Sequence, residues 1–193
     1  REHGLKIGTI ADLIQYRSEH ESMVERLASR DVQTPWGPFQ AVAYRDLASG
    51  AAHVALVHGS ITPDVEALVR VHEPTSMLDV LFEGPTNHSW SVSSALKAIA
   101  AAPAGVLIML NCQESSDVLF AQFQAWNEAP VPPAKAAGRE SRYDLRTYGI
   151  GAQIMRDLNV GKARLLARPR KMPSMTGFSL TITGYDSEPL HTP

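Results

Sequence analysis

The spacing of apolar and polar residues predicts short strands and helices that alternate along most of the chain. Runs rich in β-branched and aromatic residues, separated by glycine, proline and polar turns, predict strands at 39–44, 52–58, 67–72, 163–166 and 178–183. Residues 106–110 are continuously apolar, which is typical of a strand buried on both faces of a sheet. The turn residues at 47–50 predict that the first two strands form a hairpin.

Apolar residues at helical spacing predict helices at 91–102, at about 115–128 and at 144–158. The last helix is predicted despite Gly149 and Gly151, each of which costs about 1 kcal/mol relative to alanine. Residues 129–138 hold three prolines and are predicted to form a loop. Because strands and helices are interspersed, the predicted fold class is α/β (mixed α+β): one three-layer domain with a mixed, largely antiparallel sheet flanked by helices.

The first thirty residues differ in pattern from the rest. Thr9 and Asp12 have the spacing of a capping box, and the residues after them are helical in pattern. Residues 18–30 are charged and poor in apolar side chains, which is typical of a tether or a solvated helix. We therefore expect the compact body to begin near Asp31 and divide the chain into 1–30 and 31–193.

Composition narrows the possible functions. The chain has 193 residues, 44% of them hydrophobic, and a net charge of −2, so nothing favours general binding to nucleic acid or to anionic membranes. Its single cysteine excludes an intramolecular disulfide and any zinc site that needs two or more thiolates from this chain. The apolar stretch 98–110 is too short to span a bilayer, and no basic-then-apolar leader opens the chain, so we expect a cytoplasmic protein.

An ordered series of motifs over about 32–189 resembles GTP cyclohydrolase II, the enzyme that opens riboflavin biosynthesis. The motifs are Thr34-Pro-Trp-Gly-Pro-Phe39, His53-Val-Ala-Leu-Val-His-Gly59, Arg70-Val-His72, Tyr143-Asp-Leu-Arg-Thr-Tyr-Gly-Ile-Gly-Ala-Gln-Ile-Met155, Leu158-Asn-Val-Gly161, Arg164-Leu-Leu166 and Pro169-Arg-Lys171. Residues 3–17 resemble the C-terminal end of 3,4-dihydroxy-2-butanone 4-phosphate synthase, which is often fused in front of such a domain. The resemblance implies the family's fold and a fused synthase domain as partner.

The resemblance implies that the family's zinc site is missing from this sequence. By resemblance, a zinc-bound water attacks the guanine ring, and three cysteines in a Cys-x10-Cys-x-Cys pattern hold the metal. The matching positions here are Thr75, Thr86 and His88, and the one cysteine, Cys112, lies elsewhere. Because threonine hydroxyls are poor zinc ligands beside thiolate or imidazole, we predict that zinc is absent. No cofactor is expected, with magnesium only if a nucleotide binds.

Other family positions are partly retained. The Gln-Glu-Gly-Arg substrate motif appears as Gln113-Glu-Ser-Ser116, which keeps Glu114, and an active-site tyrosine is replaced by Trp126. By resemblance, the remaining substrate-binding positions are Arg70, Arg170 and Lys171, and the catalytic positions are Asp144 as proton acceptor and Arg146 as nucleophile. Without the metal, we expect the last two to bind without turnover.

Each of these residues also has an alternative role, in most cases a structural one. Asp144 can cap a helix, Arg146 can be a solvated or paired helix residue, and residues 168–171 can be a plain basic loop. Arg70 lies in an apolar strand and can hold a structural pair instead of a phosphate. The remaining alternatives are a new metal site formed by His72 and His88 with Glu73 or Asp79, a buried hydrophobic role for Cys112, and packing roles for Trp36 and Trp126.

Three functions are consistent with these observations. The first is a catalytically degenerate GTP cyclohydrolase II-like domain that is structural, dimerising or regulatory beside the synthase. The second is a module that binds GTP or another nucleotide, and the third is a zinc-free hydrolase acting on a nucleotide or related phosphate ester. The resemblance also implies a homodimer, with neither nucleic acid nor a membrane as partner.

Overall fold

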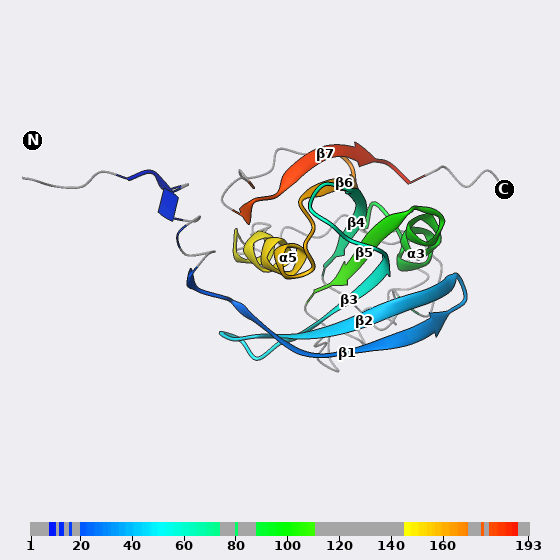
Figure 1. The fold of residues 1–193 in the computed structure, drawn as a ribbon, viewed down its shortest axis with the longest axis horizontal. Helices are drawn as coiled ribbons and strands as arrows, with labels where there is room; N and C mark the ends of the chain where they lie inside the picture. The colour runs from blue at the N-terminus through cyan, green and yellow to red at the C-terminus, as the bar shows by residue number, and fades with distance from the viewer. Residues whose placement is uncertain are drawn as a thin grey trace, which may run out of the picture.

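The computed structural model describes residues 8–10, 12, 13, 16, 20–73, 80, 88–110, 145–169, 175 and 178–188. They form one sheet with the strand order β1-β2-β3-β5-β4-β6-β7 and two helices (Figure 1). The strands are β1 (Val24–Thr34), β2 (Gly37–Asp46), β3 (Ala52–Gly59), β4 (Glu66–His72), β5 (Ala104–Met109), β6 (Lys162–Leu166) and β7 (Thr181–Asp186). The helices are α3 (Val92–Ala101) and α5 (Leu145–Asp157).

The sheet is mixed, as predicted, but its parallel share is larger than expected. The pairs β1–β2, β2–β3 and β3–β5 are antiparallel, whereas β5–β4, β4–β6 and β6–β7 are parallel. Parallel neighbours need a crossover connection, and α3 lies between β4 and β5 in the chain while α5 lies between β5 and β6. The largely antiparallel arrangement therefore holds only for the first half of the sheet.

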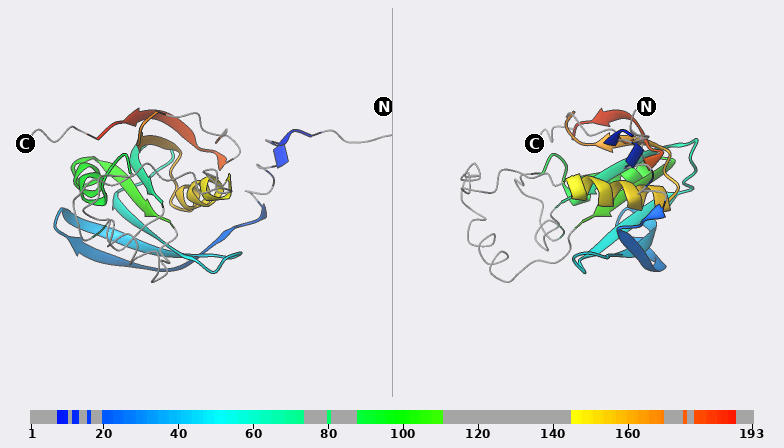
Figure 2. Two further views of the ribbon diagram at one scale, coloured as in Figure 1. Left: turned by 180° about the vertical axis from the view of Figure 1, so that it is seen from behind. Right: turned by 90° about the vertical axis from the view of Figure 1, so that its left-hand side faces the viewer.

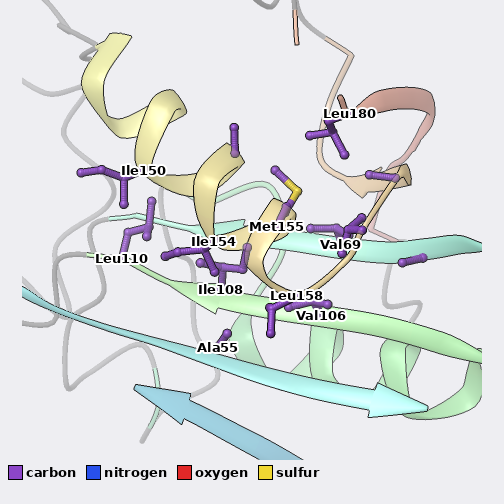
Figure 3. Close-up of a cluster of buried hydrophobic side chains, with 14 of the residues drawn as sticks. Ala55, Val69, Val106, Ile108, Leu110, Ile150, Ile154, Met155, Leu158 and Leu180 are labelled. Carbon is purple, nitrogen blue, oxygen red and sulfur yellow. The ribbon is translucent and has the colours of Figure 1, made fainter. Parts of the chain in front are cut away.

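The two described helices pack on opposite faces of the sheet. Val106 and Ile108 of β5 belong to the buried cluster that includes Ile154 of α5, as Figure 3 shows. Leu107, which points the other way, belongs to the cluster that includes Ile99 of α3. The prediction that this apolar strand is buried on both faces is confirmed. The three-layer arrangement of the whole domain stays a prediction.

Most predicted elements in the described residues are found within three residues of their expected bounds, and the hairpin of β2 and β3 is confirmed. The last strand is displaced, because β7 starts at Thr181 and not at residue 178. Ser179 adopts a left-handed backbone with φ of 55°, and the Phe178 N–H donates to the Met175 carbonyl, so the chain turns there before the strand begins. The predicted helix at 115–128 and loop at 129–138 lie outside the described residues.

The expectation of a tether or solvated helix over 18–30 is wrong for its second half. Strand β1 begins at Val24 and pairs with β2 from Val24 opposite Asp46, seven residues before the expected start of the body at Asp31. The strand lies at the edge of the described sheet, and the side chains of 25–31 are exposed. Such a strand is held by backbone pairing and carries charged residues on both faces, so it lacks an apolar period. The division at residue 31 otherwise stays a prediction.

The capping box near the start of the chain is present. The Thr9 N–H donates to Asp12 Oδ2 at 2.8 Å, and the Asp12 N–H donates to Thr9 Oγ1 at 3.1 Å. The hydrogen bonds from the Thr9 backbone and hydroxyl lower the pKa of Asp12. No helix among the described residues is long and apolar enough to cross a bilayer.

Two glycines with the same backbone conformation differ in their surroundings and allow a test of the fold. Gly59 and Gly50 both have φ of 71°, but an added Cβ at Gly59 would lie 2.1 Å from the Pro103 carbonyl oxygen, whereas the space around Gly50 is open. We predict that Gly50→Ala lowers the free energy of unfolding by about 1–2 kcal/mol through backbone strain. Gly59→Ala should cost about 1–3 kcal/mol more through overpacking. Urea unfolding measures both, and equal losses would contradict the close approach of β3 to Pro103.

Candidate functional site

The candidate site is a cavity of about 300 Å³ between the sheet and α5. Strand β4 contributes residues 69–71 to its wall, and α5 contributes Tyr148, Gly151 and Met155. Polar side chains follow the carboxyl ends of the neighbouring parallel strands β4 and β6, where Glu73 and Arg168 line the cavity. In open sheets, this edge is where ligands bind. The cavity is thus apolar along α5 and polar where the strands end.

Arg70 lies in β4 and is only 5% exposed, although it borders the cavity. Its Nη1 donates to the Leu166 carbonyl at 3.0 Å and to Ser89 Oγ at 3.2 Å, and its Nη2 donates to the Trp90 carbonyl at 3.3 Å. The guanidinium therefore ties the middle of β4 to the end of β6 and to the segment that precedes α3. These contacts are those of a structural role, which is the alternative considered for Arg70. Contact of Arg70 with a phosphate stays a prediction.

A second set of hydrogen bonds fixes the segment between Arg70 and α3. The indole N–H of Trp90 donates to the Asp186 carbonyl at the end of β7, at 2.8 Å. Ser91 caps α3, because its Oγ accepts the Ser94 N–H at 3.0 Å, and its own N–H donates to Glu188 Oε1 at 3.3 Å. The wall at His88 and Ser89 is thereby attached to the chain at and after the end of β7. Sequence reasoning missed Ser89 and Trp90, since no local pattern marks their partners.

The structure brings together the two histidines that were considered as metal ligands. The rings of His72 and His88 lie 3.9 Å apart between centroids, at an angle of 37°. His72 is buried, and His88 is half-buried and borders the cavity, as does Glu73. Rings packed against each other in this way differ from ligands to one zinc ion, whose nitrogens converge on a point about 2.0–2.1 Å away. Within the described part of the chain, no three histidine, cysteine, aspartate or glutamate side chains could hold a metal together.

Several candidate residues lie outside the described residues: Thr75, Thr86, Glu114, Asp144, Arg170 and Lys171, together with Asp79, Cys112 and Trp126. The backbone of Arg146 lies in α5, and its side chain is not described. Arg168 is exposed at the cavity. Trp36 packs against the α3 cluster, as its packing alternative predicts.

Most of the chain matches a known protein family. The model of the family GTP cyclohydrolase II matches residues 25–187. The chain belongs to the GTP cyclohydrolase II family. The match begins one residue after the start of β1, which supports the inclusion of this charged edge strand in the domain.

The relatives of this family member come from riboflavin biosynthesis, as the motifs predicted. The chain is 45% identical over 185 residues to the 3,4-dihydroxy-2-butanone 4-phosphate synthase of Neisseria meningitidis serogroup B, covering 96% of this chain and 48% of that protein. It is 40% identical over 184 residues to the Pseudomonas aeruginosa protein of the same name, covering 95% and 49%. Identity to the riboflavin biosynthesis protein RibBA of Aquifex aeolicus is 38%, covering 94% and 46%.

The chain is also similar in fold to a solved structure. RibBX from A. baumannii, described as a two-domain 3,4-dihydroxy-2-butanone 4-phosphate synthase, matches with a TM-score of 0.57 and 29% identity, covering 96% of this chain and 46% of that one. The chain spans about half the length of the curated relatives it matches.

The structural role of Arg70 can be tested against Arg168, an arginine exposed at the same cavity. We predict that Arg70→Met lowers the free energy of unfolding by about 2–4 kcal/mol, because the Leu166 and Trp90 carbonyls lose their buried donor. Arg168→Met should change stability by no more than about 0.5 kcal/mol. Urea unfolding of both variants gives the comparison. A small loss at Arg70 would contradict its role as the link between β4 and the cavity walls.

Proposed function

We propose that this domain is a non-catalytic member of the GTP cyclohydrolase II family. It serves as a structural, dimerising or regulatory partner of a 3,4-dihydroxy-2-butanone 4-phosphate synthase domain in riboflavin biosynthesis. The observation that carries the proposal is the donor set at the family's zinc positions, where Thr75, Thr86 and His88 replace three cysteines in a chain with one cysteine.

The donor chemistry at these positions does not fit the zinc ion of the family. Cys112 is outside the motif, and the ring of His88 is packed against that of His72. Zinc can lower the pKa of a bound water to about 7, whereas the pKa of a water molecule without a metal stays far above neutral pH. Asp144 and Arg146 would thus have no activated water to work with, so we propose that they bind without turnover.

The scaffold is retained although these chemical groups have changed. The sheet, α5 and the cavity beside them are present, and the family match runs over 25–187. Substrate positions have changed along with the metal positions, with Ser115 and Ser116 in place of glycine and arginine. A fold kept without its reactive groups favours a role in binding or assembly.

The names of the relatives agree with this proposal. The Neisseria and Pseudomonas proteins, at 45% and 40% identity, are named for the synthase alone. A relative from Arabidopsis thaliana, named a bifunctional riboflavin biosynthesis protein, is 34% identical. We further propose a cytoplasmic homodimer that contains a fused synthase domain and holds no zinc in this domain.

The second candidate function is nucleotide binding, with magnesium only as the nucleotide's companion. The cavity favours it, because Arg168 is exposed at its polar side and is available to bind phosphate. Glu73 and His88 border the same space and offer polar contacts. No observation of comparable weight supports the zinc-free hydrolase, since the structure does not describe the side chains of Asp144 and Arg146.

The main proposal predicts no ring opening of GTP. Full-length protein purified with zinc in the medium should contain far less than one zinc per chain by elemental analysis, and should release no formate from GTP with added zinc and magnesium. A GTP cyclohydrolase II that has the three zinc cysteines, treated in parallel, is the positive control. About one zinc per chain together with formate release would refute the proposal.

Nucleotide binding predicts a ligand-dependent melting temperature. GTP should raise it more than guanosine does, following RT ln(1 + [L]/Kd), and the rise should shrink with added salt. Arg168→Glu should remove most of the difference between GTP and guanosine, while Arg45→Glu, an exposed substitution on β2, should not. If neither ligand changes the melting temperature of the wild-type protein, the domain is not a nucleotide-binding module.

A further inference from the structure

Helix α5 has a buried polar side chain that the cavity does not use. Gln153 is 8% exposed, and both polar atoms of its carboxamide bind the backbone of the residues that lead into β1. The Met23 N–H donates to Gln153 Oε1 at 2.6 Å, and Gln153 Nε2 donates to the Glu21 carbonyl at 3.2 Å. One side chain thus holds a three-residue stretch that lies about 130 positions earlier in the chain.

A carboxamide is the group that suits this geometry. Glutamine offers one acceptor and one donor at the end of the same side chain, whereas an ionised glutamate only accepts and methionine does neither strongly. The two hydrogen bonds together fix the direction of residues 21–23 as well as their position. Replacement of Gln153 by an apolar residue would leave a buried N–H and carbonyl to find other partners.

The packing around Met23 reinforces these hydrogen bonds. An added Cβ at Gly149 would lie 2.7 Å from Met23 Cε, so the glycine lets this side chain approach the helix. The Met23 carbonyl accepts the Leu47 N–H at 2.9 Å, which attaches the same residue to the end of the β2–β3 hairpin. The entry into β1 is therefore held from two sides, by α5 and by the sheet.

A local contact joins two residues on the N-terminal side of this attachment. His20 Nδ1 is hydrogen-bonded to the Tyr16 carbonyl at 2.8 Å, and the two rings stack at 4.2 Å with an angle of 19°. The described residues before Glu21 are exposed and extend away from the domain on the side where α5 lies, as Figures 1 and 2 show. The same helix borders the cavity through Tyr148, Gly151 and Met155.

We infer that Gln153 is a positioning residue that fixes the orientation of the N-terminal segment to the cavity helix. The direction in which the chain before residue 21 extends from the domain then follows α5. This inference does not depend on whether the cavity binds a nucleotide or whether GTP is turned over.

The test compares three variants in the full chain. Gln153→Met removes both hydrogen bonds at nearly constant length, and Gln153→Glu keeps the acceptor for the Met23 N–H but places a carboxylate against the Glu21 carbonyl. Gln40→Met, on the exposed side of β2, is the matched control. NMR measures exchange of the Met23 amide. Pulsed electron paramagnetic resonance measures distances between labels at Leu13→Cys and Lys97→Cys, in a Cys112→Ser background.

We expect Gln153→Met to speed exchange at Met23 at least tenfold and to broaden the distance distribution, while Gln40→Met leaves both as in the wild type. Gln153→Glu should broaden the distribution but keep Met23 protected, which separates loss of orientation from loss of folding. The inference is overturned if the distribution stays as narrow in the folded Gln153 variants as in the wild type, whether or not exchange changes.

Discussion

The buried guanidinium of Arg70 is the constraint that organises the candidate site. It stands in the middle of β4 and donates to the end of β6 and to the residues before α3, so three separate segments meet at one side chain. Burying a charge is costly unless hydrogen bonds compensate for the lost water, and the carbonyls of Leu166 and Trp90 supply acceptors. The cavity keeps its walls because this network keeps the ends of two parallel strands beside the segment that leads into α3.

Helix α5 links this site to the rest of the molecule. Ile154 of α5 and Leu158, the first residue after the helix, belong to the buried cluster on one face of the sheet. Tyr148 and Met155 of the helix border the cavity. Gln153 holds the chain that enters β1. The helix therefore contributes to the stability of the fold through contacts that do not involve catalysis. These contacts hold the fold together independently of any metal ligand.

Local patterns in the sequence predicted the elements whose side chains are buried on a regular period. The continuous apolar run of β5 and the apolar face of α3 predicted their positions, and the spacing of Thr9 and Asp12 predicted a capping box that is present. Strand β1 was missed because an exposed edge strand has no apolar period. The contacts of Arg70 with Leu166 and of Gln153 with Met23 could not be predicted, since these partners lie 96 and 130 positions away and depend on the completed sheet.

We propose that the domain has no site for the zinc ion of its family. The ordered motifs and the family match establish the fold, whereas the substitutions at Thr75, Thr86 and His88 concern coordination chemistry alone. The most direct measurement is anomalous diffraction at the zinc absorption edge from crystals of the full-length protein soaked in zinc. The account predicts no anomalous peak bounded by residues 75, 86 and 88. A peak of full occupancy there would contradict it.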